Sequence, residues 1–98
     1  MLGAIGVQKH IPPTIRIMQT NEDIVRRFYQ AVDALYAFGE IKRVAHFERE
    51  CGINHGTFYK LRIDPTRHLL RPAWLAHLVE HYGVSADWLL LGRGRMFE

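Results

Sequence analysis

Three side chains with the chemistry of a metal site lie close together in the segment His77-Leu78-Val79-Glu80-His81. Their spacing matches one class of zinc peptidases, and His77 and His81 would share one face of a helix. A catalytic zinc ion also needs a third protein ligand and a substrate cleft. No other pattern in the 98 residues supplies them. We therefore expect surface histidines beside a core stripe, no metal, no cofactor and no enzymatic activity.

Basic side chains form a second set that is capable of binding. The chain has 13 Lys and Arg against 10 Asp and Glu, a formal net charge of +3. Seven basic and three acidic residues lie between positions 42 and 71, so this window has a net charge of +4 and the rest of the chain −1. Such a cluster favours contact with nucleic-acid phosphates, although a solvated surface of scattered charges would give the same count.

Apolar residues at helical spacing predict five short helices. The first begins at Thr20, where a Thr followed three residues later by Asp is typical of a helix start, and it ends at Gly39. The others are expected at about residues 41–51, 55–61, 72–82 and 86–91. Residues 1–19 contain Pro12-Pro13 and two glycines, and we expect a flexible N-terminal tail there. Because no alternating pattern typical of strands occurs, the sequence predicts an all-α compact bundle of about five short helices.

Length and composition limit the organisation of the chain. Ninety-eight residues, 48% of them apolar, suffice for one globular domain, which we place at residues 20–98. A single cysteine, Cys51, excludes a disulfide within the chain and fits a reducing cytoplasm. Its place on the apolar face of its helix predicts a small buried hydrophobic residue. No segment approaches the roughly 20 apolar residues that a membrane span needs.

The segment from Val44 to Leu61 has the spacing of two short helices joined by a tight turn. Gly52 can adopt the positive φ that such a turn needs, and apolar residues fall where the two helices would touch. Those residues are Phe47, Cys51, Ile53, Phe58 and Leu61. A polar outer face remains on the helix at about 55–61, and such a face fits the major groove of DNA. We therefore expect a helix-turn-helix at about residues 41–61.

This helix-turn-helix resembles that of the Cro and phage-repressor-like family of DNA-binding proteins, the xenobiotic-response-element class of bacteria and phages. A second segment is similar to the last helix of that family: Tyr82-Gly83-Val84-Ser85-Ala86-Asp87-Trp88-Leu89-Leu90-Leu91-Gly92. Gly94-Arg95-Met96-Phe97 is similar to the ending of a bacterial subgroup. The resemblance covers about residues 21–97. It implies a bundle of the lambda-repressor-like type that binds double-stranded DNA.

The resemblance also implies roles for individual residues. In the geometry of that family, the residues that read bases would be His55, Gly56, Thr57 and Lys60. Contacts with DNA phosphates would come from Lys42, Arg43, Asn54, Tyr59, Arg62, Arg67 and Arg71. Lys42 and Arg43 are expected at the start of the second helix, whose amide end would meet the DNA backbone.

Three places depart from the family's pattern or leave alternatives open. Glu48 stands where a small residue usually lies between the two helices, so we expect either a wider crossing or a Glu48 that points outward. Gly56 stands where the family often has a base-reading side chain, which indicates either a close approach of the backbone or the reading of fewer bases. Met96 and Phe97 are apolar for a tail, and they either fold back on the bundle or pack against a two-fold partner.

Together these features predict a stand-alone transcriptional regulator, in the first place a repressor, that binds double-stranded DNA as a homodimer. Its expected location is the cytoplasm, in association with the nucleoid. The alternative is a protein-interaction module of the same fold, such as an antitoxin or an accessory factor of a mobile element, that acts through a protein partner. No contact with a membrane is expected.

Overall fold

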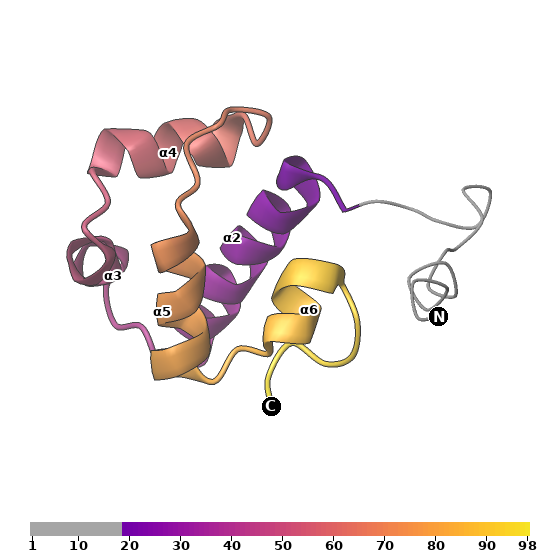
Figure 1. Ribbon diagram of the computed structural model, residues 1–98. Coiled ribbons are helices and arrows are strands. Elements are labelled where there is room, and N and C mark those ends of the chain that lie inside the picture. Colours follow the sequence, from indigo (N-terminus) through magenta and orange to yellow (C-terminus); the bar gives the residue numbers. More distant parts are fainter. Residues whose placement is uncertain (1–18) are drawn as a thin grey trace, which may run out of the picture.

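The computed structural model describes residues 19–98, which fold into five helices (Figure 1). In chain order they are α2 (Asn21–Ala37), α3 (Val44–Cys51), α4 (His55–Ile63), α5 (Pro72–Tyr82) and α6 (Ala86–Leu91). Residues 19–98 contain no strand, only an isolated bridge between Val84 and Phe97. The predicted all-α bundle is thus confirmed. Of the tail expected at residues 1–19, positions 1–18 lie outside the described residues.

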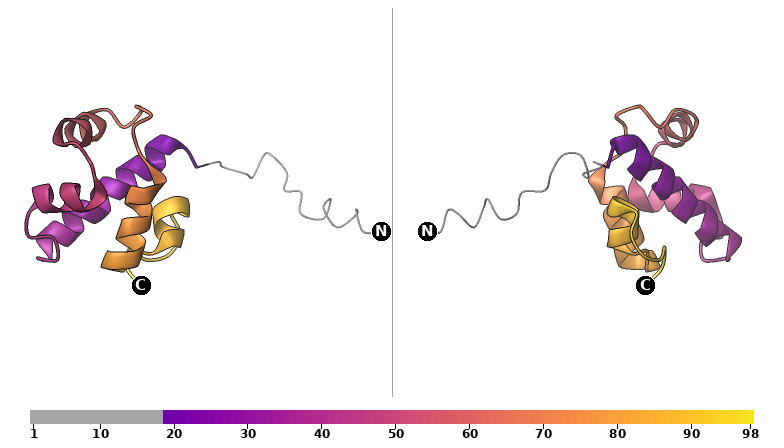
Figure 2. Two further views of the ribbon diagram at one scale, coloured as in Figure 1. Left: turned by 60° about the vertical axis from the view of Figure 1, so that its left-hand side comes forward. Right: turned by 90° about the vertical axis from the view of Figure 1, so that its right-hand side faces the viewer.

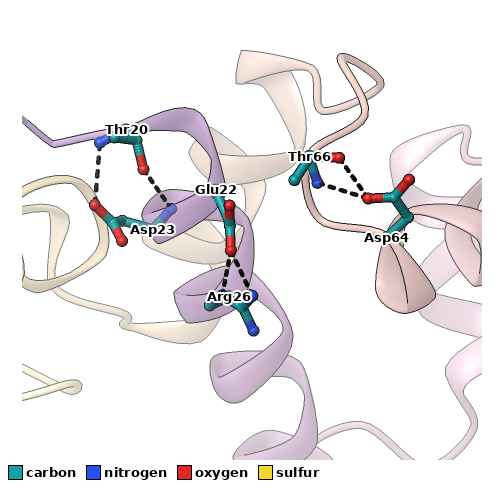
Figure 3. Close-up of polar contacts among 6 residues, drawn as sticks. All are labelled: Thr20, Glu22, Asp23, Arg26, Asp64 and Thr66. Carbon is teal, nitrogen blue, oxygen red and sulfur yellow. Dashed lines mark hydrogen bonds and ion pairs between the residues drawn. The ribbon is translucent and has the colours of Figure 1, made fainter.

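Helix α2 is the support against which the later helices pack. It begins with the predicted cap, since the Thr20 hydroxyl accepts a hydrogen bond from the Asp23 amide at 3.1 Å (Figure 3). The Asp23 carboxylate in turn accepts from the Thr20 amide at 3.1 Å, which satisfies a second amide at the helix start. The buried face of α2 contacts α4, α5 and α6. Its residues are Val25, Phe28, Tyr29, Ala31, Val32 and Leu35.

Aromatic rings fill the centre of the core. The ring of the fully buried Phe28 lies 5.0 Å from that of Tyr29, 6.2 Å from that of Phe47 and 6.1 Å from that of Trp74. Phe58 completes the group at 5.0 Å from Tyr29. Large rings bury much apolar area and attract one another in edge-on and tilted arrangements. This cluster therefore joins α2, α3, α4 and α5 into one body.

The C-terminal segment folds back on the junction between α5 and α6. The Ser85 amide donates to the Met96 carbonyl at 2.8 Å, and the Glu98 amide donates to the Gly83 carbonyl at 3.1 Å. The Phe97 ring lies 6.0 Å from the Phe38 ring at the end of α2. Of the two alternatives for this segment, the structure therefore shows folding back. None of the helices in residues 19–98 has the length and apolar character needed to cross a membrane.

Two helix boundaries differ from the predicted ones. The helix expected at 41–51 begins only at Val44. The reason is that Ile41 is buried in the core, and its amide donates to the Leu35 carbonyl at 3.1 Å. Lys42 and Arg43 therefore precede α3, with Arg43 at its N-cap, where we had expected them in the first turn. Helix α4 in turn continues to Ile63, two residues beyond the predicted end.

Candidate nucleic-acid interface

A tight turn at Gly52 joins α3 to α4. Gly52 has φ 70°, and its amide and that of Ile53 donate to carbonyls in the last turn of α3. Ile53 is buried, and it ties the turn to the core. In Figure 1 α3 is seen end-on while α4 lies across the view, so the two helices cross steeply. The predicted two helices and turn are therefore present, and this steep crossing is the arrangement of a helix-turn-helix.

Helix α4 is anchored to the bundle by its buried face and by a hydrogen bond to its backbone. Phe58 and Leu61 are buried against the core. The Tyr29 hydroxyl donates to the Phe58 carbonyl at 2.7 Å. Burial raises the pKa of Tyr29 far above its ordinary value, so this hydroxyl keeps its proton and remains a donor at neutral pH. These contacts fix how far α4 stands from α2.

The opposite face of α4 points to solvent. His55, Gly56, Tyr59 and Lys60 are exposed, and Thr57 is half-buried. Because residues four apart share a helix face, His55, Tyr59 and Ile63 form one row, and Gly56 and Lys60 form the next. Three of the four predicted base readers thus lie on one exposed surface. Ile63, 65% exposed, extends that surface, and its place was missed because the helix was expected to end at Leu61.

Glu48 excludes one of the two alternatives that the sequence left open for it. Its side chain does not point outward: only 4% of the residue is exposed, and the carboxylate lies within the crossing of α3 and α4. There the carboxylate oxygens lie 3.0 and 3.3 Å from Nδ1 of His55. The His55 side chain itself is 78% exposed. The small residue expected between the helices is thus replaced by a buried carboxylate that holds an exposed imidazole.

A local contact explains the glycine at position 56. Asn54 is the N-cap of α4, and its side-chain oxygen accepts from the amides of Gly56 at 2.8 Å and Thr57 at 3.3 Å. A Cβ atom at position 56 would lie 3.0 Å from that oxygen, closer than such atoms normally approach. The cap therefore favours glycine at this place whether or not a ligand approaches the backbone. The side-chain oxygen of Asn54 is thus engaged with the start of α4.

Several of the basic residues predicted to contact phosphates fall into two groups, one before α3 and one between α4 and α5. Lys42 and Arg43 line a groove with His46 and Tyr82 ahead of α3. Arg71 lines a second groove, between the α3–α4 turn and the segment before α5, together with Asn54, Thr57 and His68. Arg67 is exposed in the same segment and lies 3.7 Å from the Asp64 carboxylate. Asp64 itself accepts from the Thr66 amide at 3.2 Å (Figure 3).

Arg62 has a partner within the protein. Two of its nitrogens donate to the Asp33 carboxylate at 2.9 and 3.1 Å, so the two side chains form a bidentate pair between α4 and α2. The guanidinium also lies over the rings of Tyr29 and Phe58, 4.7 and 5.6 Å from their centroids. The hydrogen bonds to Asp33 raise the pKa of the guanidinium. Contact of Arg62 with a DNA phosphate stays a prediction that competes with this pair.

No protein-family model, curated protein or solved structure matches this chain.

A second cluster of polar side chains surrounds Glu50 and includes the histidines whose spacing suggested a metal site. The Glu50 carboxylate accepts from His77 at 3.0 Å and from the Tyr82 hydroxyl at 2.8 Å, and it lies 3.2 Å from His46. The hydrogen bonds from His77 and Tyr82 lower the pKa of Glu50. His77 and His81 lie side by side on one face of α5, with their rings tilted and the ring centroids 4.6 Å apart. Residues 19–98 contain no group of three or more side chains arranged to hold a metal ion.

Cys51 lies at the end of α3, next to this cluster. It is half-buried where full burial was expected, and its thiol is free. Burial raises the pKa of the thiol to about 11, so the reactive thiolate is scarce at neutral pH. Cys51 therefore has the role of a packing residue rather than a nucleophile.

Proposed function

We propose that this protein binds double-stranded DNA sequence-specifically by placing α4 in the major groove, and that it acts as a stand-alone transcriptional regulator of the repressor type. The observation that carries the proposal is the division of α4 into two faces. One face is fixed by Phe58, Leu61 and the Tyr29 hydroxyl, and the other presents polar side chains at the edge of the bundle. A helix held in this way fits a groove that is wide enough for one helix.

Separate parts of the site have separate roles in this proposal. Lys60 donates to guanine, and His55 and Thr57 contact base edges near the start of α4, while Gly56 lets the backbone approach. Phosphate contacts hold α4 in register from both sides. They come from Lys42, Arg43, Asn54, Tyr59, Arg67 and Arg71. In this proposal the two basic groups contact different strands of the duplex.

We further propose a homodimer that binds two half-sites one helical turn apart, in the cytoplasm at the nucleoid. Exposed apolar side chains support a protein contact of this kind. Phe38 is 70% exposed beside Phe97, and Tyr36, Leu90 and Leu91 are also exposed. The same side chains favour the second candidate function, a protein-interaction module such as an antitoxin or an accessory factor of a mobile element. Light scattering with and without DNA measures the number of copies that bind one site.

Selection of bound sequences from a random duplex pool tests the proposal directly. The wild-type protein is expected to enrich one motif at low salt. Lys60→Ala should cost about 1–3 kcal/mol, a five- to 150-fold loss, and should relax the motif at one base pair. Arg43→Ala should weaken binding to all sequences alike and reduce the slope of log K against log salt by about one.

Arg95→Ala is the matched control. It removes the same charge from the C-terminal segment, which lies at the opposite end of the bundle from α4 (Figures 1 and 2). It should leave both the motif and the salt slope unchanged. If the wild-type protein enriches no motif at low salt, specific DNA binding is refuted and the protein-interaction function is favoured. If Lys60→Ala and Arg43→Ala behave like Arg95→Ala, the placement of α4 on DNA is wrong.

A further inference from the structure

Glu48 is the one buried charged side chain in residues 19–98. A carboxylate taken out of water loses its hydration, and this loss is costly unless hydrogen bonds replace it. Apart from the ring of His55, no side chain of the described residues donates to this carboxylate. A small apolar residue at this position would avoid the cost altogether. The stability of the fold therefore does not explain why a carboxylate is buried at position 48, and this side chain needs another role.

The pair with His55 is poorly placed to supply stability. The His55 side chain is 78% exposed, so water already solvates most of the ring. Ion pairs and hydrogen bonds to such exposed groups contribute little to folding. The pair acts instead on the ring itself, since an exposed side chain at the first position of α4 would otherwise rotate freely.

The hydrogen-bonding chemistry of the pair fixes the state of the ring. An ionised carboxylate can only accept hydrogen bonds, so Nδ1 of His55 must carry a hydrogen. The two carboxylate oxygens, at 3.0 and 3.3 Å, also select one of the two ring orientations related by a half-turn. The other nitrogen, Nε2, lies on the far side of the imidazole from Nδ1 and has no hydrogen bond to the described residues. Whatever His55 binds is therefore met by Nε2.

We propose that Glu48 is a positioning residue: it holds the His55 ring with Nδ1–H toward α3 and Nε2 outward, and thereby sets which base His55 selects. The inference rests on the proposed binding of α4 to DNA. Without Glu48 the ring can turn over and move its hydrogen between the two nitrogens. The ring then offers a donor or an acceptor to the same base edge, and discrimination at that base pair is lost.

Two measurements on the full chain test the inference, with Glu48→Gln and Glu48→Leu as variants. The first measures the ¹⁵N chemical shifts of the imidazole nitrogens in the free protein. In the wild type Nδ1 of His55 should have the shift of a nitrogen that carries hydrogen. In Glu48→Leu the ring should move toward the form with hydrogen on Nε2, which free neutral histidine prefers.

The second measurement repeats the selection from random duplexes. Both variants should still bind DNA, with equal or greater affinity at low salt because a negative charge has been removed. The preference at one base pair of each half-site should fall by roughly five- to tenfold, as expected for the loss of one hydrogen-bonded contact. In a His55→Ala background, Glu48→Gln should change the motif no further.

Glu50→Gln is the control, because it removes a carboxylate from the same helix that contacts His46, His77 and Tyr82 instead of His55. It should leave the His55 shifts and the motif unchanged.

Unchanged His55 shifts in both Glu48 variants would overturn the positioning role. Shifts that move while the motif stays intact would overturn the role in base selection alone. If the wild type enriches no motif, the base-selection role falls with the proposed function, while the ¹⁵N shifts still decide whether Glu48 orients the ring. Should Glu48→Leu not fold, Glu48→Gln, which has nearly the same shape, carries the test.

Discussion

Replacement of Arg62 by methionine separates two roles for this side chain, a support for α4 and a contact with DNA. Arg62 leaves α4 and meets Asp33 on α2 through two hydrogen bonds of 2.9 and 3.1 Å. Its guanidinium covers the rings of Tyr29 and Phe58. Methionine keeps an apolar stem over those rings and removes the charge. The substitution thus tests the charged contacts and not the packing.

The size of the effect follows from these contacts. The side chains of Arg62 and Asp33 are 36% and 60% exposed, so their ion pair belongs to the weak, solvated class. Its bidentate geometry puts it at the upper end of that class, about 1 kcal/mol. The cation over the two rings adds about 0.5 kcal/mol. Arg62→Met should therefore lower the free energy of unfolding by about 1.5 kcal/mol and the Tm by roughly 6–12 °C for a domain of this size.

Urea denaturation followed by circular dichroism measures this loss, and Asp33→Asn with the double variant completes a double-mutant cycle. The cycle should give a coupling energy of about 1 kcal/mol between the two side chains. The salt slope of DNA binding should be the same in Arg62→Met as in the wild type. The reasoning is refuted if stability does not change and the slope falls by about 0.9, because Arg62 would then neutralise a phosphate.

Two further predictions concern α3 and its end. Glu50→Gln should destabilise the protein at neutral pH. Hydrogen bonds from His77 and Tyr82 lower the pKa of Glu50 below its ordinary 4.5. The ionised carboxylate therefore contributes fully to the free energy of unfolding above pH 4.5, and this contribution disappears as the pH falls through the lowered pKa. Urea denaturation across the acid range should show the two proteins converge, and a difference that persists in acid would contradict this origin. Gly52→Ala should cost about 1 kcal/mol, because φ of 70° strains any residue with a Cβ atom although no neighbour obstructs it. Gly52→Asn should cost less in the same assay, and equal losses for the two would indicate a steric cause instead.

Local signals explain the parts of the fold that the sequence predicted well. The cap formed by Thr20 and Asp23 needs only four residues of chain, and Gly52 needs only its own backbone freedom. The start of α3 could not be predicted in this way. Helical spacing extends back to Ile41, but the burial of that side chain in the core draws the segment 41–43 out of the helix.

The candidate site was predictable as a surface and not as a set of contacts. The spacing of Phe58 and Leu61 was enough to place His55, Gly56 and Lys60 on the outer face of α4. The partners of the site residues come from elsewhere in the chain. Arg62 pairs with Asp33, 29 positions away, and the inward direction of Glu48 depends on how α3 crosses α4. Such pairings depend on distances in the folded protein, and the order of charges along the chain does not give those distances.

The window of residues 42–71 has a net charge of +4, and the structure shows where its three acidic residues lie. Each of them is engaged within the protein: Glu48 with His55, Glu50 with His77 and Tyr82, and Asp64 with Thr66.

By contrast, no ion pair within residues 19–98 involves Lys42, Arg43, Lys60 or Arg71, and all four are exposed. The acidic side chains of the window therefore leave these four cations unpaired, whereas Asp64 lies beside Arg67 and Asp33 pairs with Arg62. Opposite charges in this window are sorted by direction, with carboxylates turned inward or paired and these cations turned outward. This sorting explains how a chain with a net charge of only +3 can present a distinctly cationic surface to a polyanion.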